Sequence, residues 1–167
     1  MKNKKKIDIT VLIPTYYRNG YLKKLLNFFS SFNYVFNIII LDSTPNNKSK
    51  LEFINILTNH KMIKYYSYEE NIKFSEKIFL GLKEVNTKYS VLCADDDYLL
   101  PDCLEKCINF LENHKKFTSI TGISCVHHMN NEKKFIMHQN YNKGKSLYYN
   151  TAKKRFLEYA ILGKTKM

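Results

Sequence analysis

Residues 89–97 read Tyr-Ser-Val-Leu-Cys-Ala-Asp-Asp-Asp, an apolar run that ends in three consecutive carboxylates. The run itself, residues 89–94, has the length and composition of a buried strand. Three adjacent carboxylates repel one another, and a divalent cation relieves that repulsion. Oxygen ligands suit Mg²⁺ or Mn²⁺, which commonly take one or two carboxylates together with substrate phosphates. We therefore predict Asp95, Asp96 and Asp97 as metal ligands; the alternative is a loop whose acids favour the dipole of the next helix.

Segments with strand and helix patterns alternate on both sides of this stretch. Further strands are expected at residues 7–13, 36–41, 62–68, 117–127 and 134–139, and helices at residues 20–32, 48–59, 73–85, 102–115 and 151–162. In the helix at 73–85, we expect Phe74, Ile78 and Leu82 to face inward. Repeated strand–helix alternation predicts an α/β fold, with a mainly parallel central sheet flanked by helices.

Polar residues follow three of the predicted strands. The first strand ends in Pro-Thr-Tyr-Tyr-Arg at residues 14–18, the second in Asp42 and Ser43, and the fourth in the three aspartates. In parallel sheets of this type, ligands bind beyond the carboxyl ends of the strands. The three polar segments are therefore expected to meet at one edge of the sheet and to form a binding site there.

These segments resemble motifs of the family 2 glycosyltransferases, which have the Rossmann-like GT-A fold. Residues 93–102 resemble the DxD region of that family, and residues 11–18 resemble its first strand and nucleotide loop. Residues 39–43 resemble the second-strand acid, and residues 71–77 lie where the family has a helix start between nucleotide and metal. The resemblance runs from about residue 7 to residue 128 with all motifs in order.

The resemblance implies a nucleoside-binding side of the site. Pro14, Thr15 and Tyr16 would line the base pocket, with Tyr16 against the base ring. Asp42, with Ser43 beside it, would accept hydrogen bonds from the base or the ribose. The implied ligand is a nucleoside-diphosphate sugar, a UDP-sugar first among the candidates.

The resemblance also implies a phosphate and metal side. Arg18 and Lys77 would face the diphosphate, and Asp95 would hold the ribose. Asp96 and Asp97 would hold the metal or the sugar, and the sequence leaves open which of them is closer to the ion. The metal would neutralise the departing nucleoside diphosphate.

Three positions depart from the family pattern. Tyr17 stands where members often have Asn, while Lys73 and Lys77 stand where many have Gly and Asn. For Tyr16, Tyr17 and Arg18 the alternative is ordinary loop packing, and for Lys77 it is a solvated helix face. These departures leave the identity of the donor open.

The resemblance implies an inverting transfer to an acceptor hydroxyl, which needs a carboxylate base. The acids after Asp102 are Glu105, Glu112, Glu132 and Glu158, and none has the context of such a base. We therefore expect one domain over residues 1–167 that ends before an acceptor-binding half. It would bind the nucleotide sugar and metal but transfer sugar poorly. The acceptor would be a glycan or a lipid-linked molecule, in surface glycan synthesis.

The net charge of +12 raises the question of other partners. The basic residues are almost all Lys and are spread along the chain, so we expect no nucleic-acid partner. Without a membrane span or targeting segment, a cytoplasmic location is expected, with peripheral contact to an anionic membrane surface allowed by the charge. Two alternatives are a nucleotidyltransferase, which would carry a Gly-rich loop after the first strand, and a non-catalytic module that binds nucleotides or nucleic acid.

Overall fold

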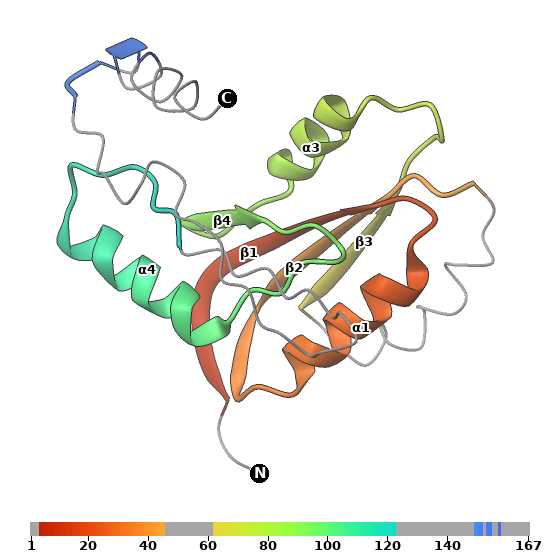
Figure 1. The fold of residues 1–167 in the computed structure, drawn as a ribbon, viewed down its shortest axis with the longest axis horizontal. Helices are drawn as coiled ribbons and strands as arrows, with labels where there is room; N and C mark the ends of the chain where they lie inside the picture. The colour runs from red at the N-terminus through yellow and green to blue at the C-terminus, as the bar shows by residue number, and fades with distance from the viewer. Residues whose placement is uncertain (1–3, 46–61, 123–148, 152, 155–156, 158–167) are drawn as a thin grey trace, which may run out of the picture. The chain divides into compact units, whose positions relative to one another are not determined.

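The computed structural model describes residues 4–45, 62–122, 149–151, 153–154 and 157 (Figure 1). The chain divides into two compact units, Met1–Glu105 and Lys106–Met167. The elements in chain order are β1 (Lys5–Thr15), α1 (Asn19–Ser30), β2 (Tyr34–Asp42), β3 (Ile63–Ser67), α3 (Phe74–Lys83), β4 (Tyr89–Leu92) and α4 (Pro101–Asn113).

The sheet of the first unit has four strands in the order β3-β2-β1-β4, and all three pairings are parallel. β1 therefore lies inside the sheet, with β2 on one side and β4 on the other. Its burial reflects this position, because residues Ile9 to Ile13 are all buried. The predicted α/β fold with a mainly parallel sheet is confirmed.

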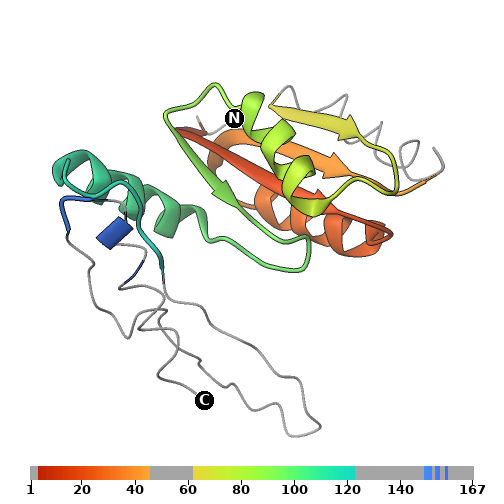
Figure 2. The same cartoon turned by 90° about the horizontal axis from the view of Figure 1, so that it is seen from above.

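Helices α1 and α3 cover opposite faces of the sheet (Figure 2). α1 buries Leu22, Leu25, Leu26 and Phe29, which recur at helical spacing. On the other face, Leu12, Ile39 and Leu41 form a cluster, and partly buried side chains that include Ile78 of α3 pack against it. Both faces of β1 are thus covered, which explains why its consecutive apolar residues, Val11 to Ile13, are all buried.

The buried face of α3 differs from the prediction. Ile78 packs against the sheet cluster as expected, but Phe74 and Leu82 are 60% and 46% exposed, so their inward placement was wrong. The helix instead buries Lys77 and Gly81. A Cβ at Gly81 would lie 2.5 Å from Leu41 Cδ1, so the missing side chain allows the helix to approach the strands closely there. Apolar spacing alone does not reveal which face makes that approach.

The remaining predicted elements lie partly or wholly outside the described residues. The helix at 48–59 and the strand at 134–139 lie outside them. Residues 117–122 form no strand, so this part of the predicted fifth strand was wrong, and the rest of it is not described. The helix at 151–162 is helical at its described residues 153, 154 and 157. Among the described residues, no helix has the length and apolar character needed to cross a membrane.

Candidate functional site

The carboxyl ends of β1, β2 and β4 bring the predicted site segments together. Thr15 and Asp42 are partners in the β1–β2 register. Asp95 follows β4, and its Oδ2 accepts a 2.7 Å hydrogen bond from the Thr15 hydroxyl. This bond joins two residues that are 80 positions apart in the sequence. From β1 the chain continues to β2 on one side of β1, whereas β4 pairs with β1 on its other side. Thr15 and Asp95 therefore flank the point at which the strand order reverses. In open α/β sheets, ligands bind in the crevice at that point.

Five polar residues at this edge are buried, and we call them the inner group: Thr15, Asp42, Ser43, Lys77 and Asp95. Lys77 is only 4% exposed, and its ammonium donates to the Thr15 carbonyl at 3.1 Å and to Ser43 Oγ at 2.8 Å. Burial lowers the pKa of Lys77, while the charges of Asp42 and Asp95 act in the opposite direction. Lys77 is therefore not on a solvated helix face; it ties the end of β1 to the end of β2.

Asp42 is held by two hydrogen bonds at the end of β2. Its Oδ1 accepts from the Thr44 N–H at 2.8 Å, and its Oδ2 accepts from the Tyr65 hydroxyl at 2.5 Å. Burial, together with the bond to Asp42, raises the pKa of Tyr65, so this phenol stays a donor. Asp42 is only 1% exposed, and each of its carboxylate oxygens keeps a lone pair beyond the one that Thr44 or Tyr65 uses.

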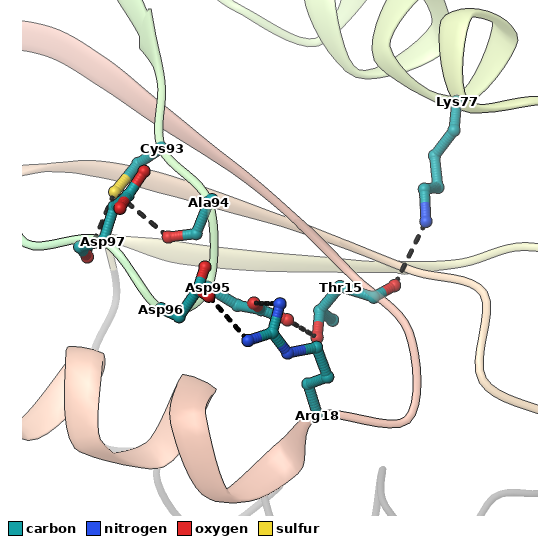
Figure 3. A network of polar contacts seen from close by, with 8 residues as sticks. All are labelled: Thr15, Arg18, Lys77, Cys93, Ala94, Asp95, Asp96 and Asp97. Atoms are coloured by element: carbon teal, nitrogen blue, oxygen red, sulfur yellow. Dashed lines mark hydrogen bonds and ion pairs between the residues drawn. The ribbon is translucent and has the colours of Figure 1, made fainter.

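Arg18 joins the inner group to the exposed turn after β4. Its guanidinium lies 3.1 Å from Asp95 Oδ1 and donates to Asp96 Oδ2 at 2.7 Å (Figure 3). The hydrogen bond from Arg18 lowers the pKa of Asp96. Asp95 thus has both oxygens in contact with protein groups, Thr15 on one and Arg18 on the other, whereas Asp96 is exposed.

Asp97 lies on the side of the turn nearer to Cys93 and away from Arg18 (Figure 3). Its backbone N–H donates to the Ala94 carbonyl at 3.1 Å, which closes the turn. Cys93 beneath it is buried, and burial, together with the nearby carboxylates, raises the pKa of its thiol to about 12. The side chain of Asp97 itself is exposed.

The three aspartates can be tested as metal ligands by their chemistry and position. In the described part of the chain, no set of three or more His, Cys, Asp or Glu side chains is arranged to hold an ion. Asp95 is buried and engaged by Thr15 and Arg18, whereas Asp96 and Asp97 are exposed, although Asp96 pairs with Arg18. Exposed carboxylates are the ligand type that Mg²⁺ and Mn²⁺ take together with water and substrate phosphates.

The loop after β1 is fastened to the loops that follow the other strands. The Tyr16 hydroxyl donates to Glu70 Oε1 at 2.7 Å, and this bond raises the pKa of Tyr16 to about 12. The Tyr17 N–H donates to Thr44 Oγ1 at 2.8 Å. Arg18 binds the turn after β4, as described above. Loops after β3, β2 and β4 thus each hold one of three consecutive residues.

All predicted nucleoside and phosphate residues lie at this edge, and three further residues that the sequence did not reveal support them. Thr44, Tyr65 and Glu70 hold Tyr17, Asp42 and Tyr16, respectively. Each partner is between 23 and 54 positions away in the sequence, and no local pattern marks it. Pro14 is half-buried directly before Thr15.

Of the four acids considered as a base, Glu105 lies away from this edge. Glu105 accepts from the Tyr34 hydroxyl at 3.1 Å and pairs with Lys5. Lys5 and Tyr34 are register partners at the amino ends of β1 and β2, so Glu105 lies at the opposite edge of the sheet. Glu112 of α4 pairs with Lys115, which follows the end of that helix. Glu132 and Glu158 lie outside the described residues.

Comparison with solved structures shows the same fold. TarS from S. aureus, as its 1–349 form, superimposes with a TM-score of 0.55 at 20% identity, over 65% of this chain and 33% of that one. The same protein in complex with UDP gives a TM-score of 0.54 at 20% identity and the same coverage. The mannosyltransferase PcManGT from Pyrobaculum calidifontis, in complex with GDP-Man and Mn²⁺, gives 0.56 at 15% identity, over 72% of this chain and 36% of that one.

Sequence comparison places the chain in a family. An uncharacterized protein of Acanthamoeba polyphaga mimivirus is 30% identical over 125 residues, which are 68% of this chain and 25% of that protein. The chain thus spans about a quarter of this relative and a third of the matched structures. The model of glycosyl transferase family 2 matches residues 10–165. The chain belongs to glycosyl transferase family 2.

Proposed function

We propose that this chain binds a nucleoside-diphosphate sugar together with Mn²⁺ or Mg²⁺ and forms the donor-binding part of an inverting glycosyltransferase. The acceptor would be a hydroxyl of a glycan or of a lipid-linked molecule, in the synthesis of a surface glycan. The net charge of +12 would favour peripheral contact with an anionic membrane on the cytoplasmic side.

One observation carries the proposal: the Thr15–Asp95 hydrogen bond across the point where the strand order reverses. It fixes the first-strand loop against the aspartate turn at the position where α/β sheets bind ligands. Because the chain belongs to glycosyl transferase family 2, we take the ligand at this position to be a nucleotide sugar. The matched structures that carry UDP or GDP-Man are consistent with a nucleotide ligand.

The nucleoside would be held by Pro14, Tyr16 and two members of the inner group, Asp42 and Asp95. Tyr16, fixed through its hydroxyl by Glu70, would lie against the base, beside Pro14. Asp42 would accept from the base or ribose with the lone pairs that Thr44 and Tyr65 leave free. Asp95 would likewise accept a hydrogen bond from the ribose. Lys77 would contribute its charge from beneath the loop rather than by contact, because its ammonium is already bonded to Thr15 and Ser43.

The exposed carboxylates would face the diphosphate side. Asp96 and Asp97 would hold the cation, which supplies Lewis-acid neutralisation of the departing nucleoside diphosphate. Arg18 now pairs with Asp95 and Asp96, and its guanidinium is suited to a phosphate once those carboxylates are otherwise occupied. The base that deprotonates the acceptor is not proposed among the described residues.

Calorimetry with UDP, GDP and TDP, each with and without Mn²⁺, tests the proposal. We expect at least one nucleotide to bind, and Mn²⁺ to tighten binding. Asp96→Ala and Asp97→Ala should remove the metal-dependent part of the affinity. Asp8→Ala is the matched control, since Asp8 is an exposed acid in β1 away from the carboxyl edge. Equal affinity with and without Mn²⁺ in the unmodified chain would show that the carboxylates have a structural role instead.

A further inference from the structure

Tyr17 has an unusual backbone conformation. Its φ is 53°, and among the described residues it is the only one other than glycine with a positive φ. A bulky side chain is disfavoured there, whereas Asn and Gly adopt this conformation more easily. The Tyr17 N–H bond to Thr44 Oγ1 holds the conformation in place. Strained backbone of this kind is often found at ligand-binding sites, where the function of the side chain compensates for the cost of the strain.

The ring of Tyr17 packs against Tyr16 to form a corner. The two ring centroids are 4.7 Å apart with an interplanar angle of 71°, and the Tyr17 side chain is among the most exposed aromatic groups of the unit at 60%. Tyr16 is anchored through its hydroxyl to Glu70. Two nearly perpendicular rings make a bounded space and not a flat platform, so a base that lies on one ring meets the other at its edge.

The corner lies on the nucleoside side of the site. The backbone of Tyr17 is bonded to Thr44, whose own N–H is bonded to Asp42 at the end of β2. The metal side, at Asp96 and Asp97, follows β4 on the other side of β1. A planar group placed in the corner would therefore be a base and not a phosphate.

We propose that Tyr17 is a specificity-determining residue that limits the size of the base, so that the site takes a pyrimidine nucleoside diphosphate in preference to a purine one. The inference rests on the proposed function, because it requires a nucleotide at this edge. A single-ring base on Tyr16 would lie within the corner, whereas the second ring of a purine would extend toward Tyr17. Matched structures with UDP and with GDP-Man have the same fold, so the fold alone does not decide this preference.

Calorimetry of UDP and GDP, with Mn²⁺ present, tests this on the full chain and on two variants. The unmodified chain should bind UDP at least about tenfold more tightly than GDP, a discrimination within the range that pocket size provides. Tyr17→Asn should bring the affinities for UDP and GDP to within about threefold of each other, since it removes the ring that limits the size of the base. Tyr17→Phe keeps the ring and should keep the ratio.

Thermal unfolding of the same proteins separates loss of selectivity from loss of fold. Tyr17→Asn should melt at the same temperature as the unmodified chain or higher, because Asn adopts the left-handed conformation with less strain. An unchanged UDP-to-GDP ratio in folded Tyr17→Asn, or tighter binding of GDP than UDP by the unmodified chain, overturns the inference while leaving the proposed function intact. If the unmodified chain binds no nucleotide at all, the proposed function fails and the inference with it.

Discussion

The inner group and the exposed residues around it occupy the same edge of the sheet but differ in their surroundings. The inner group consists of Thr15, Asp42, Ser43, Lys77 and Asp95, all buried. We call the others the outer group: Tyr16, Tyr17, Arg18, Asp96 and Asp97, which are exposed or, for Arg18, half-exposed. In the inner group hydrogen bonds join residues of β1, β2, α3 and the loop after β4, whereas the outer group projects from loops.

The difference separates residues that are held rigidly in a buried network from residues that are open to solvent. A buried polar network with its hydrogen bonds made is rigid, and each member is costly to remove. Lys77 is the cation of this network, close enough to Asp42 and Asp95 for their charges to act on it. Exposed ion pairs contribute little to stability and exchange partners easily. We therefore expect stability to depend on the inner group and ligand binding to depend more directly on the outer group.

The largest expected effect is that of Lys77→Met. The substitution keeps most of the side-chain volume but removes the bonds to the Thr15 carbonyl and Ser43. It also removes a positive charge that acts on two buried carboxylates, Asp42 and Asp95. Unfolding free energy from urea titration should fall by about 3 kcal/mol. Lys73→Met, an exposed position directly before α3, is the control and should change little. Equal stability of the two variants would mean that Lys77 does not hold the inner group together.

The next effect is that of Thr15→Val. Valine has nearly the same shape but does not donate to Asp95, and a hydrogen bond to a charged group contributes about 2 kcal/mol. Thr15→Ser retains the hydroxyl and should recover most of that loss, which urea titration of the pair would measure. If the serine variant were as unstable as the valine variant, the methyl group and not the hydrogen bond would be responsible.

The fold was largely predictable because it depends on local patterns. Short runs of consecutive apolar residues marked β1 (11–13) and β2 (38–41), and strand–helix alternation implied the parallel sheet that is observed. The helix α3 shows the limit. Its buried face depends on the close approach at Gly81 and on a lysine that reaches the strand ends, and both are properties of the tertiary structure.

The site was predictable as a location but not as a network. The ends of β1, β2 and β4 meet as expected, since parallel topology requires it. The partners of the site residues were not predictable, because Thr44, Tyr65 and Glu70 act through contacts between distant loops. The split of the three aspartates, with Asp95 buried and the other two exposed, also depends on the turn geometry and not on spacing.

A smaller effect is expected from acid on the Arg18–Asp96 pair. Arg18 lowers the pKa of Asp96 in the folded chain, so this carboxyl binds its proton less readily when folded than when unfolded. Its contribution to stability is therefore present above the ordinary pKa of about 3.9 and is lost as the pH falls through the lower folded value. The loss should be smaller than that of Thr15→Val, because an exposed pair is screened. Urea titrations between pH 5 and pH 3 would detect it as a difference from Asp96→Asn, and 1 M salt should reduce that difference.

The smallest effect on stability is expected for Asp97→Asn. Asp97 is exposed, and the hydrogen bond that closes its turn comes from the backbone and survives the substitution. Unfolding free energy should remain within about 0.5 kcal/mol of the original value, while the effect of Mn²⁺ on nucleotide affinity is lost. A variant that is fully stable and yet no longer responds to metal would show that the outer group serves the ligand alone. A loss of stability comparable to that of Thr15→Val, with the metal response retained, would mean that Asp97 acts as the inner group does. The distinction between the inner and outer groups would then not hold.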